Sequence, residues 1–563
     1  MNRTFKRTGW AAAIATTAVL STISHAEQQS GKYDPTAEAL AEISTMQVGK
    51  YDWPQWSGWN GRNNTPSGKN IASTWNVEDG TNIKWSAKLG SQTFGNPVVA
   101  NGKVYVGTNN NAGYVKRYPP SIDLGCLLCF DEKTGEFLWQ HSSEKLPTGR
   151  VHDWPQMGIC CAPFIDGERG WFVTSRGEVV CFDTEGFRDG ENDGPFTAEA
   201  NDNKDEADVV WRFDMMGELG TSQHNMCSCS ITGTGDVLFV NTANGVDESH
   251  IKLPAPNAPS FFAINRNTGK VLWTDNSPGE NIMHGQWSSP AYAVIGEVPQ
   301  VLFAGGDGWL YSFDARGDGK GHSAMLWKFD CNPKNTKWVL GGRGTRNEPI
   351  ATPVIYDGLV YIAVGQDPEH GEGPGRLWCI DPNKRGDVSS ELAVDSKGQI
   401  VPPRRLDGVD PDAGEKAVPN PNSALVWKFE KTGANFDQQM HRTLGTVAIK
   451  DDILYIADLS GLFHCLDAKT GAQYWTYDML AACWGTPLIV DGKVFIGDED
   501  GDMAIFKHSK DPQVALKDVN GEMKPAFGDI FMGSAVYSTP IVANDVLFIA
   551  NRTNLYAIAP SAK

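Results

Sequence analysis

The chain has 563 residues, 40% of them hydrophobic, and a formal net charge of −19. This hydrophobic share supports a large buried core and excludes an intrinsically disordered protein. The acidic balance, with no Lys/Arg cluster in the sequence, argues against a nucleic-acid partner, because neutralising phosphates requires a basic face.

The first 26 residues predict a secretion signal. Arg3, Lys6 and Arg7 precede an apolar stretch from Trp10 to Ile23, and Ser24-His25-Ala26 supplies the small residues of a cleavage site. No later stretch reaches the roughly 20 apolar residues that a membrane span requires. We therefore expect a soluble periplasmic or secreted protein, in a compartment where disulfides persist.

Residues 27–80 predict a helix followed by a tryptophan-rich extension. Asp34-Pro35 has the form of a helix N-cap with Pro at the first helical position, and the helix should continue to about Met46. The segment from Asp52 to Trp59 (DWPQWSGW) then places three Trp within eight residues. We expect this segment to lie as a plug against the domain that follows.

Residues 81–563 predict one repeated unit. A complete copy contains a short run of β-formers, an Asp/Asn-Gly turn, two further β-runs, a Thr-Gly turn and a Trp, as in Pro97–Trp139 and Thr446–Trp475, whereas the copy at Pro487 lacks its Trp. Six further copies begin at Pro163, Ser230, Pro290, Pro353, Pro487 and Pro540. A unit of this kind repeated through the chain predicts the blades of a propeller.

The two ends of the repeat region complement each other. The copy at Pro540 ends after three strands, whereas the segment Asn82–Trp85 carries a Trp with no unit before it. Pairing these ends completes the last blade and removes an open edge. The predicted fold is all-β, an eight-bladed β-propeller of four-stranded antiparallel blades closed by N- and C-terminal strands. Residues 386–424 are polar and Pro-rich and predict a loop insertion in the fifth blade.

The DxxTGxxxW segment resembles the tryptophan-docking repeat of the PQQ-dependent quinoprotein alcohol dehydrogenase superfamily, over roughly residues 82–560. The same repeat occurs in non-enzymatic relatives such as the outer-membrane assembly lipoprotein of bacteria, so two functions stay open. The first is a divergent oxidoreductase that binds a small-molecule ligand or a metal in the central funnel. The alternative is a non-catalytic binding or assembly propeller.

The resemblance implies PQQ held with Ca²⁺ by a Glu and an Asn, beside a catalytic Asp and a cation. Asn244 and Glu178 lie near the family's Asn and Glu positions. Met283 and Gly306 stand where the Asp and the cation would be, and without those groups the quinone lacks electrophilic activation. We therefore expect no conventional PQQ-dependent dehydrogenation. The sequence has no CxxCH motif for a c-type haem, so an oxidoreductase would need a separate electron carrier.

The segments that join successive blades enter the funnel of a propeller, and soft or imidazole side chains recur in them. We expect one mouth of the funnel to gather His152, Cys160, Cys161, His224, Cys227, His284, His441 and Cys483. Such groups suit copper, for which His152, His224 and Cys227 are candidate ligands, although packing residues around a metal-free ligand funnel would give the same pattern.

Other funnel residues predict acid–base chemistry and ligand contacts. His284, His441, Arg346 and Glu348 are candidate acid/base and anion-holding groups. Trp287 and Trp484 are candidate ligand contacts. The adjacent Cys160 and Cys161 resemble the vicinal disulfide of PQQ alcohol dehydrogenases and would act as a redox or rigidifying element.

One acidic loop resembles a calcium site. Asp189, Glu191 and Asp193 place oxygen ligands at alternate positions before Gly194, as in the first half of a Ca²⁺ loop. The twelfth position of a Ca²⁺ loop normally holds a Glu that binds the ion, and here it is Ala200. A hydrated acidic loop without metal is therefore the competing interpretation.

Overall fold

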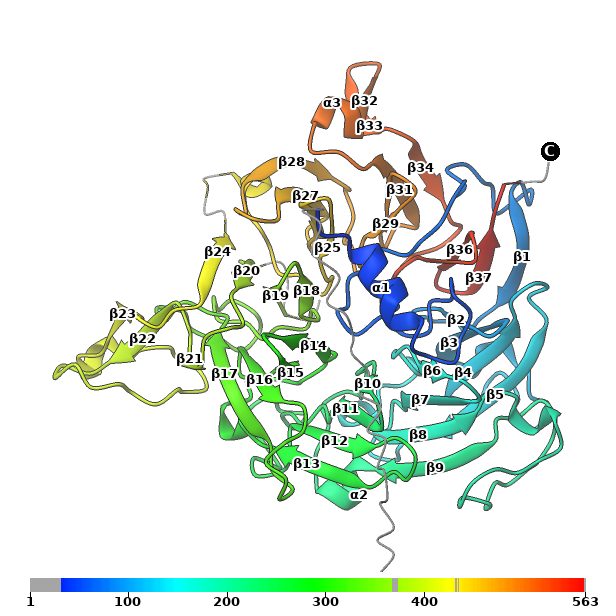
Figure 1. Cartoon of the computed structure of the whole chain (residues 1–563), viewed down its shortest axis with the longest axis horizontal. Helices are drawn as coiled ribbons and strands as arrows, with labels where there is room; N and C mark the ends of the chain where they lie inside the picture. The colour runs from blue at the N-terminus through cyan, green and yellow to red at the C-terminus, as the bar shows by residue number, and fades with distance from the viewer. Residues whose placement is uncertain (1–31, 367–372, 431–432, 434, 561–563) are drawn as a thin grey trace, which may run out of the picture. The chain divides into compact units, whose positions relative to one another are not determined.

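The computed structural model describes residues 32–366, 373–430, 433 and 435–560. The predicted signal peptide lies outside these residues. In the described part of the chain, eight four-stranded antiparallel sheets surround a central axis, which confirms the eight-bladed propeller (Figure 1). No described helix combines the length and hydropathy needed to cross a bilayer.

The first four blades follow one another in the order of the chain. Blade 1 contains β2 (Val98–Ala100), β3 (Lys103–Asn109), β4 (Leu124–Asp131) and β5 (Phe137–Glu144). Blade 2 contains β6 (Phe164–Asp166), β7 (Arg169–Val173), β8 (Glu178–Asp183) and β9 (Val209–Asp214). Blade 3 contains β10 (Thr232–Thr234), β11 (Val237–Asn241), β12 (Phe261–Asn265) and β13 (Val271–Asp275). Blade 4 contains β14 (Ala291–Ile295), β15 (Val298–Ala304), β16 (Trp309–Asp314) and β17 (Ala324–Asp330).

The remaining blades include the insertions and the closure. Blade 5 contains β18 (Val354–Tyr356), β19 (Leu359–Val364), β20 (Arg376–Ile380) and β24 (Leu425–Phe429). Blade 6 contains β25 (Ala448–Lys450), β26 (Ile453–Ala457), β27 (Leu462–Asp467) and β28 (Gln473–Asp478). Blade 7 contains β29 (Leu488–Val490), β30 (Lys493–Gly497), β31 (Asp502–Lys507) and β34 (Gly528–Phe531). Blade 8 contains β35 (Ile541–Ala543), β36 (Val546–Ala550), β37 (Asn554–Ile558) and β1 (Ile83–Lys88).

The ring closes as the sequence predicted. Strand β1 pairs antiparallel with β37, with Trp85 opposite Ala557 and Lys88 opposite Asn554. The last blade therefore combines strands from both ends of the repeat region, which leaves its outer strand paired and ties the ends together.

Two blades carry insertions. Between β20 and β24, β21 (Gly386–Asp387) adds to blade 4 and β22 (Glu391–Val394) pairs with β23 (Lys416–Pro419). In blade 7, α3 (Pro512–Ala515) and the hairpin β32 (Leu516–Val519)–β33 (Glu522–Pro525) precede the outer strand. This hairpin projects from the ring in Figure 1.

The repeat motif joins six of the eight blades to the next through a docking Trp. In the Asp-x-x-Thr-Gly turn of blade 1, the Asp131 carboxylate accepts hydrogen bonds from Lys133 N and Thr134 N at 3.0 and 2.9 Å. Gly135 follows at φ +72°, where a Cβ would lie 2.6 Å from the Trp85 ring of the neighbouring blade. In six blades the indole nitrogen of the docking Trp donates to a backbone carbonyl of the next blade at 2.9–3.1 Å. The pairs are Trp85–Glu132, Trp139–Thr184, Trp211–Arg266, Trp273–Ala315, Trp427–Ala468 and Trp475–Ser509.

A second set of contacts joins the blades near the axis. Each donor is a backbone amide at the start of one blade, and each acceptor is a side-chain oxygen at the matching position of the next blade. The donor–acceptor pairs are Ala162–Ser230, Ser230–Ser289, Thr352–Thr446, Thr446–Thr486, Thr486–Thr539 and Thr539–Asn96. This polar belt fixes equivalent positions of most blades around the axis.

The N-terminal extension closes one end of the ring. Helix α1 (Pro35–Ile43) begins after the N-cap Asp34, whose side chain accepts from Thr36 N, and ends before the predicted Met46. Residues 53–64 then hydrogen-bond to the inner-strand region of every blade, from the Trp53–Val99 pair in blade 1 to Asn64 Nδ2 and Pro540 O in blade 8. The free edges of the inner strands thereby gain partners. We call residues 53–64 the plug.

Candidate functional site

The central channel widens into an apolar funnel at the end opposite the plug. In each blade, the residue two places earlier in the sequence than the polar-belt residue lies in the channel wall. These residues are Phe94, Cys160, Ser228, Trp287, Ile350, Leu444, Trp484 and Tyr537. The upper cavity, of about 310 Å³, is also lined by Trp154, Met157 and Met226. The lower cavity, of about 170 Å³, has Trp56 of the plug and the polar belt in its wall.

Aromatic rings form one side of this funnel. The rings of Phe94 and Tyr537 stack with centroids 4.6 Å apart, and the Trp484 ring lies 5.5 and 5.0 Å from them. The Trp484 indole donates to Glu499 Oε2 at 3.1 Å, which fixes the ring orientation. Large rings held in this way provide apolar contact area at low entropic cost.

The funnel differs from the predicted one in its chemistry. Of the eight His and Cys residues expected at its mouth, only Cys160 lines the two cavities. Cys161, Cys227 and Cys483 are fully buried in the hydrophobic core. The reason is alternation: in an extended segment, neighbouring residues point to opposite sides, so Ser228 and Trp484 face the channel where Cys227 and Cys483 face the core.

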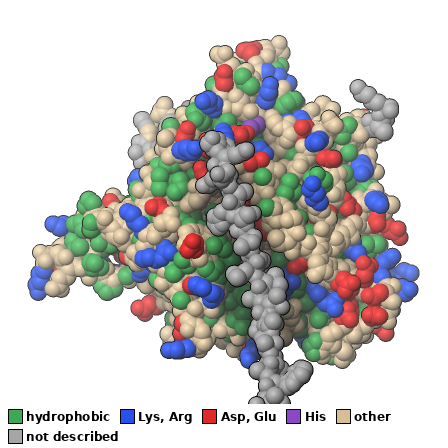
Figure 2. All heavy atoms as spheres, viewed as in Figure 1, with side chains coloured by type: hydrophobic (Ala, Val, Ile, Leu, Met, Phe, Trp, Pro, Cys, Tyr) green, Lys and Arg blue, Asp and Glu red, His purple; other side chains and the backbone are tan. Residues whose placement is uncertain are grey.

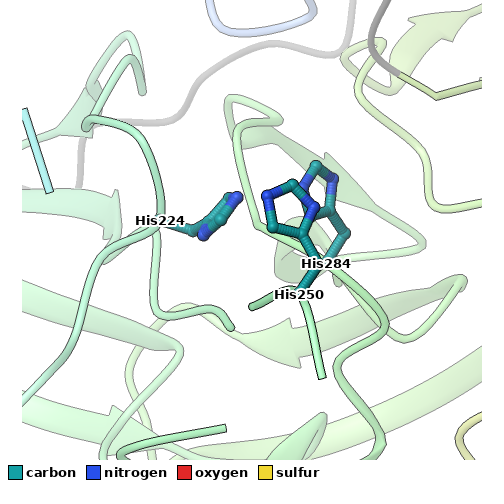
Figure 3. Close-up of side chains that lie close together, drawn as sticks. All are labelled: His224, His250 and His284. Carbon is teal, nitrogen blue, oxygen red and sulfur yellow. The ribbon is translucent and has the colours of Figure 1, made fainter. Parts of the chain in front are cut away.

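Three histidines gather behind Trp287, at the junction of blades 3 and 4. His224 precedes β10, His284 precedes β14, and His250 lies in the loop between β11 and β12. One ligand atom from each ring lies within 4.8 Å of the others, the one such group of three or more His, Cys, Asp or Glu among the described residues. Figure 3 shows the three rings directed toward a common space.

Neighbouring groups orient the cluster. His224 Nδ1 lies 2.7 Å from Val246 O, and because a carbonyl only accepts, Nδ1 carries the proton and Nε2 the lone pair. The Trp287 ring is 5.2 Å from the His284 ring and donates to His224 O at 3.2 Å. Gly245 allows the close approach, since a Cβ there would lie 2.6 Å from His284 O.

A buried carboxylate lies beside this cluster. Glu348 is 1% exposed, and its Oε1 lies 3.6 Å from His284 Nδ1. Neither carboxylate oxygen accepts a hydrogen bond from a described residue. Two of the four candidate acid/base and anion-holding groups, His284 and Glu348, are therefore brought together by the fold.

The other two predicted acid/base groups lie elsewhere. Arg346 Nη2 contacts the Asp330 carboxylate at 3.2 Å, in the wall of a separate cavity of about 430 Å³ beneath the fifth-blade insertion. His441 is buried, and its Nδ1 lies 3.1 Å from Asp458 Oδ2. The same Asp458 oxygen lies 3.4 Å from His464 Nε2. Burial raises the pKa of Asp458, but hydrogen bonds from His441 and His464 outweigh it and lower the pKa to about 2.

The residues that resemble a PQQ–Ca²⁺ site are occupied by other contacts. The Asn244 side chain accepts from Ser222 N and donates to Ala255 O, both at 2.9 Å. Glu178 lies within 4 Å of Arg176 and Arg212, in a cavity between blades 1 and 2, and burial raises its pKa. Glu178 and Asn244 line no common cavity among those found in the described chain.

The remaining soft and imidazole candidates are held by local contacts. The thiols of Cys160 and Cys161 are free: Cys160 Sγ lies 3.6 Å from Met226 Sδ, and Cys161 Sγ lies 3.0 Å from Val173 O. The structure therefore shows no vicinal disulfide. Burial raises the pKa of the Cys160 thiol to about 12 and also raises that of the Cys227 thiol well above its ordinary value. His152 bonds to Thr148 and Ser222 through its two ring nitrogens.

The candidate calcium loop makes internal contacts instead of converging on one point. Asp189 Oδ1 accepts from Glu191 N at 2.9 Å, and the Asp193 carboxylate pairs with Arg169 at 3.0 Å. Among the residues that the structure describes, these carboxylates form no metal-binding group with ligand atoms close together.

His250 is the member of the histidine cluster that sequence reasoning missed, and in the funnel wall Phe94, Ile350 and Leu444 were missed as well. His250 lies in a loop within a blade and not in an inter-blade segment, 26 residues from His224 and 34 from His284 in the sequence. Its φ of +59° places it in the left-handed region, which only the structure reveals.

Comparisons with known proteins agree with this architecture. The family described as outer membrane protein assembly factor BamB matches residues 60–185 and 416–562. The outer membrane protein assembly factor BamB of Shewanella oneidensis is 22% identical to this chain over 339 residues. The match covers 53% of this chain and 76% of that protein.

The solved structures that this chain resembles include a BamB and two alcohol-oxidising dehydrogenases. BamB from Moraxella catarrhalis has a TM-score of 0.45 and 14% identity, over 85% of this chain and 98% of that one. A europium-containing methanol dehydrogenase has a TM-score of 0.45 and 12% identity, over 92% and 100%. Quinohemoprotein alcohol dehydrogenase from Comamonas testosteroni has a TM-score of 0.42 and 12% identity, over 94% and 85%. With its eight blades and tryptophan-docking motifs, the chain is a β-propeller with PQQ-like repeats.

Proposed function

We propose that this protein is a non-catalytic binding propeller of the cell envelope, exported by its N-terminal signal, whose recognition site is the apolar funnel. The observation that carries the proposal is the funnel wall, where Phe, Trp, Ile, Leu and Tyr fill six of the eight equivalent positions. A cavity of about 310 Å³ with this lining suits apolar ligand groups. The family match to an outer membrane assembly factor supports the envelope location.

The proposed ligand is an extended chain with alternating apolar side chains. Strands of outer-membrane barrels have this pattern over about ten residues, and a factor that assists their assembly meets them before they insert. The apolar side chains would enter the funnel, while the plug closes the far end and the polar belt lies beneath. No acid or base from the predicted catalytic set is needed for such binding.

Leu444→Glu is the variant that tests the funnel. A dye-labelled ten-residue peptide alternating Val, Tyr or Leu with Thr or Ser should bind wild type, and fluorescence anisotropy should show at least tenfold weaker binding to the variant. Loss of one apolar contact of about 1.5–3 kcal/mol gives this factor. The matched control is Val519→Glu on the β32–β33 hairpin, where the side chain is 40% exposed. Equal affinity of wild type and Leu444→Glu, or equal binding of an all-polar peptide, would contradict the proposal.

A divergent oxidoreductase is the second candidate, and one observation favours it. His441 is buried with its Nδ1 toward Asp458, the arrangement that orients a general base, and its Nε2 has no hydrogen-bond partner in the described part of the chain. Small alcohols and aldehydes would be its substrates, with electrons passed to a separate carrier.

For this second candidate we expect a negative result. Purified protein supplied with PQQ and Ca²⁺ should reduce an artificial acceptor dye with alcohols or aldehydes no faster than its His441→Gln variant, because Met283 and Gly306 cannot activate the quinone. Activity that falls on His441→Gln but persists in the exposed control His322→Gln would favour the enzyme over the binding propeller.

A further inference from the structure

We infer that His224, His250 and His284 bind one divalent late transition-metal ion, Zn²⁺ or Cu²⁺, beside Glu348. The ring centroids lie 4.4–4.9 Å apart, and one ligand atom per ring falls within 4.8 Å of the other two. Imidazole is a ligand that both metals favour, and three histidines with one open position are an established zinc ligand set. This site goes beyond the proposed binding function, since it lies behind the funnel wall.

The geometry requires only a small contraction. With metal–nitrogen bonds of about 2.0–2.1 Å, ligand atoms of a tetrahedral site lie roughly 3.4 Å apart. The ligand atoms must therefore approach one another by up to about 1.4 Å, from 4.8 Å to roughly 3.4 Å. All three histidines lie outside the strands, in connecting segments, so side-chain rotation and small loop shifts can supply this movement.

The hydrogen bonding of His224 presents the correct atom. Its Nδ1 proton points to Val246 O, so Nε2 carries the lone pair that a metal needs. A histidine that binds a metal commonly donates its other ring N–H to a backbone carbonyl. For His284 a carboxylate lies on the Nδ1 side, with Glu348 Oε1 3.6 Å from Nδ1, a separation beyond hydrogen-bond distance.

Glu348 supplies the independent observation. A buried carboxylate whose oxygens accept no hydrogen bond from a described residue is costly unless positive charge lies nearby. A metal ion on the adjacent histidines supplies that charge, either by direct ligation or through the polarised His284 ring. The 3.6 Å separation matches the spacing of two ligands of one ion, so either role is sterically open.

The fifth-blade insertion holds the histidine loops together. Arg405 donates from Nη1 to Ile251 O at 2.6 Å, next to His250, and from Nε to Ile282 O at 2.7 Å, close to His284. A third bond from Nη2 reaches Met283 O at 3.2 Å. Arg405 therefore acts as a positioning residue that joins two of the three ligand segments.

The test is metal binding by tag-free protein stripped with a chelator. Titration calorimetry and elemental analysis after dialysis with Zn²⁺, and separately with Cu²⁺, should give one equivalent per chain. His250→Ala, which removes a half-buried loop residue, should abolish this binding, and Glu348→Gln should weaken it about 10- to 100-fold. The exposed His322→Ala is the matched control and should bind as wild type does. Circular dichroism should report an unchanged fold for each variant.

Electron paramagnetic resonance of the Cu²⁺ form identifies the ligands. Nitrogen hyperfine structure from imidazole should appear in wild type and in His322→Ala and be lost in His250→Ala. Binding of neither metal, or equal stoichiometry in wild type and folded His250→Ala, would overturn the inference. Leu444→Glu should bind metal normally, so failure of the funnel proposal and failure of the metal site are distinguishable.

Discussion

Replacing Arg62 by Met should lower the free energy of unfolding by roughly 3–5 kcal/mol, since several buried carbonyls lose a donor and each such loss costs about 1–3 kcal/mol. The Arg62 side chain is fully buried in the plug and donates to Pro290 O at 2.8 Å, Trp56 O at 2.9 Å and Ile231 O at 3.0 Å. Burial lowers its pKa to about 10, so the group stays charged at neutral pH. Without it, several buried carbonyls at the junction of the plug with blades 3 and 4 lose their donors.

Urea denaturation followed by circular dichroism measures this effect. Arg316→Met is the matched control, because the Arg316 side chain is 71% exposed and its pair with Asp314 is a surface ion pair that contributes little to stability. Equal midpoints for Arg62→Met and Arg316→Met would show that the plug does not stabilise the ring through Arg62.

Asp458→Asn should cost about 2 kcal/mol at pH 7, and the cost should shrink in acid. The pKa of Asp458 is lowered to about 2 in the folded protein from its ordinary value of 3.8, and each pKa unit corresponds to about 1.4 kcal/mol. Because the folded pKa is depressed, the stabilisation is complete above pH 4–5 and is lost as pH falls toward 2. His441 N and Leu462 N, at 2.9 and 3.0 Å, also bond to this carboxylate.

The measurement is the denaturation midpoint of wild type and Asp458→Asn from pH 7 to pH 3. The exposed Asp500→Asn in the neighbouring blade serves as control and should show no such pH-dependent difference. A difference between wild type and Asp458→Asn that stays constant or grows in acid would mean that Asp458 is not held ionised by its histidine partners.

The fold could be predicted because its physical basis is repeated in the sequence. In six blades the docking Trp donates to a carbonyl of the next blade, so a pattern such as Pro97–Trp139 predicts a blade. The stray Trp85 predicted the closure for the same reason. Blade 7 has no docking Trp in its outer strand β34, which follows the β32–β33 hairpin, and its fourth strand could not be found from the motif.

The site was predictable only in part, because spacing does not fix side-chain direction. Inter-blade segments do reach the funnel, yet whether Cys160 or Cys161 faces the channel depends on backbone alternation that the sequence leaves open. His224 and His284 were identified by residue type and place, whereas His250 joins them from a loop of blade 3 through tertiary folding alone. Such convergence depends on loop conformation, which has no repeat to reveal it.

Site-specific photo-crosslinking tests the central claim, that the funnel is the recognition site, most directly. A benzophenone amino acid is placed at Ile350 in the funnel wall or, as control, at Val519 on the exposed β32–β33 hairpin. With the alternating apolar peptide at saturation, mass spectrometry should find the peptide attached at position 350 and not at position 519. Attachment at position 519 with none at position 350, in protein that binds the peptide, would contradict the account.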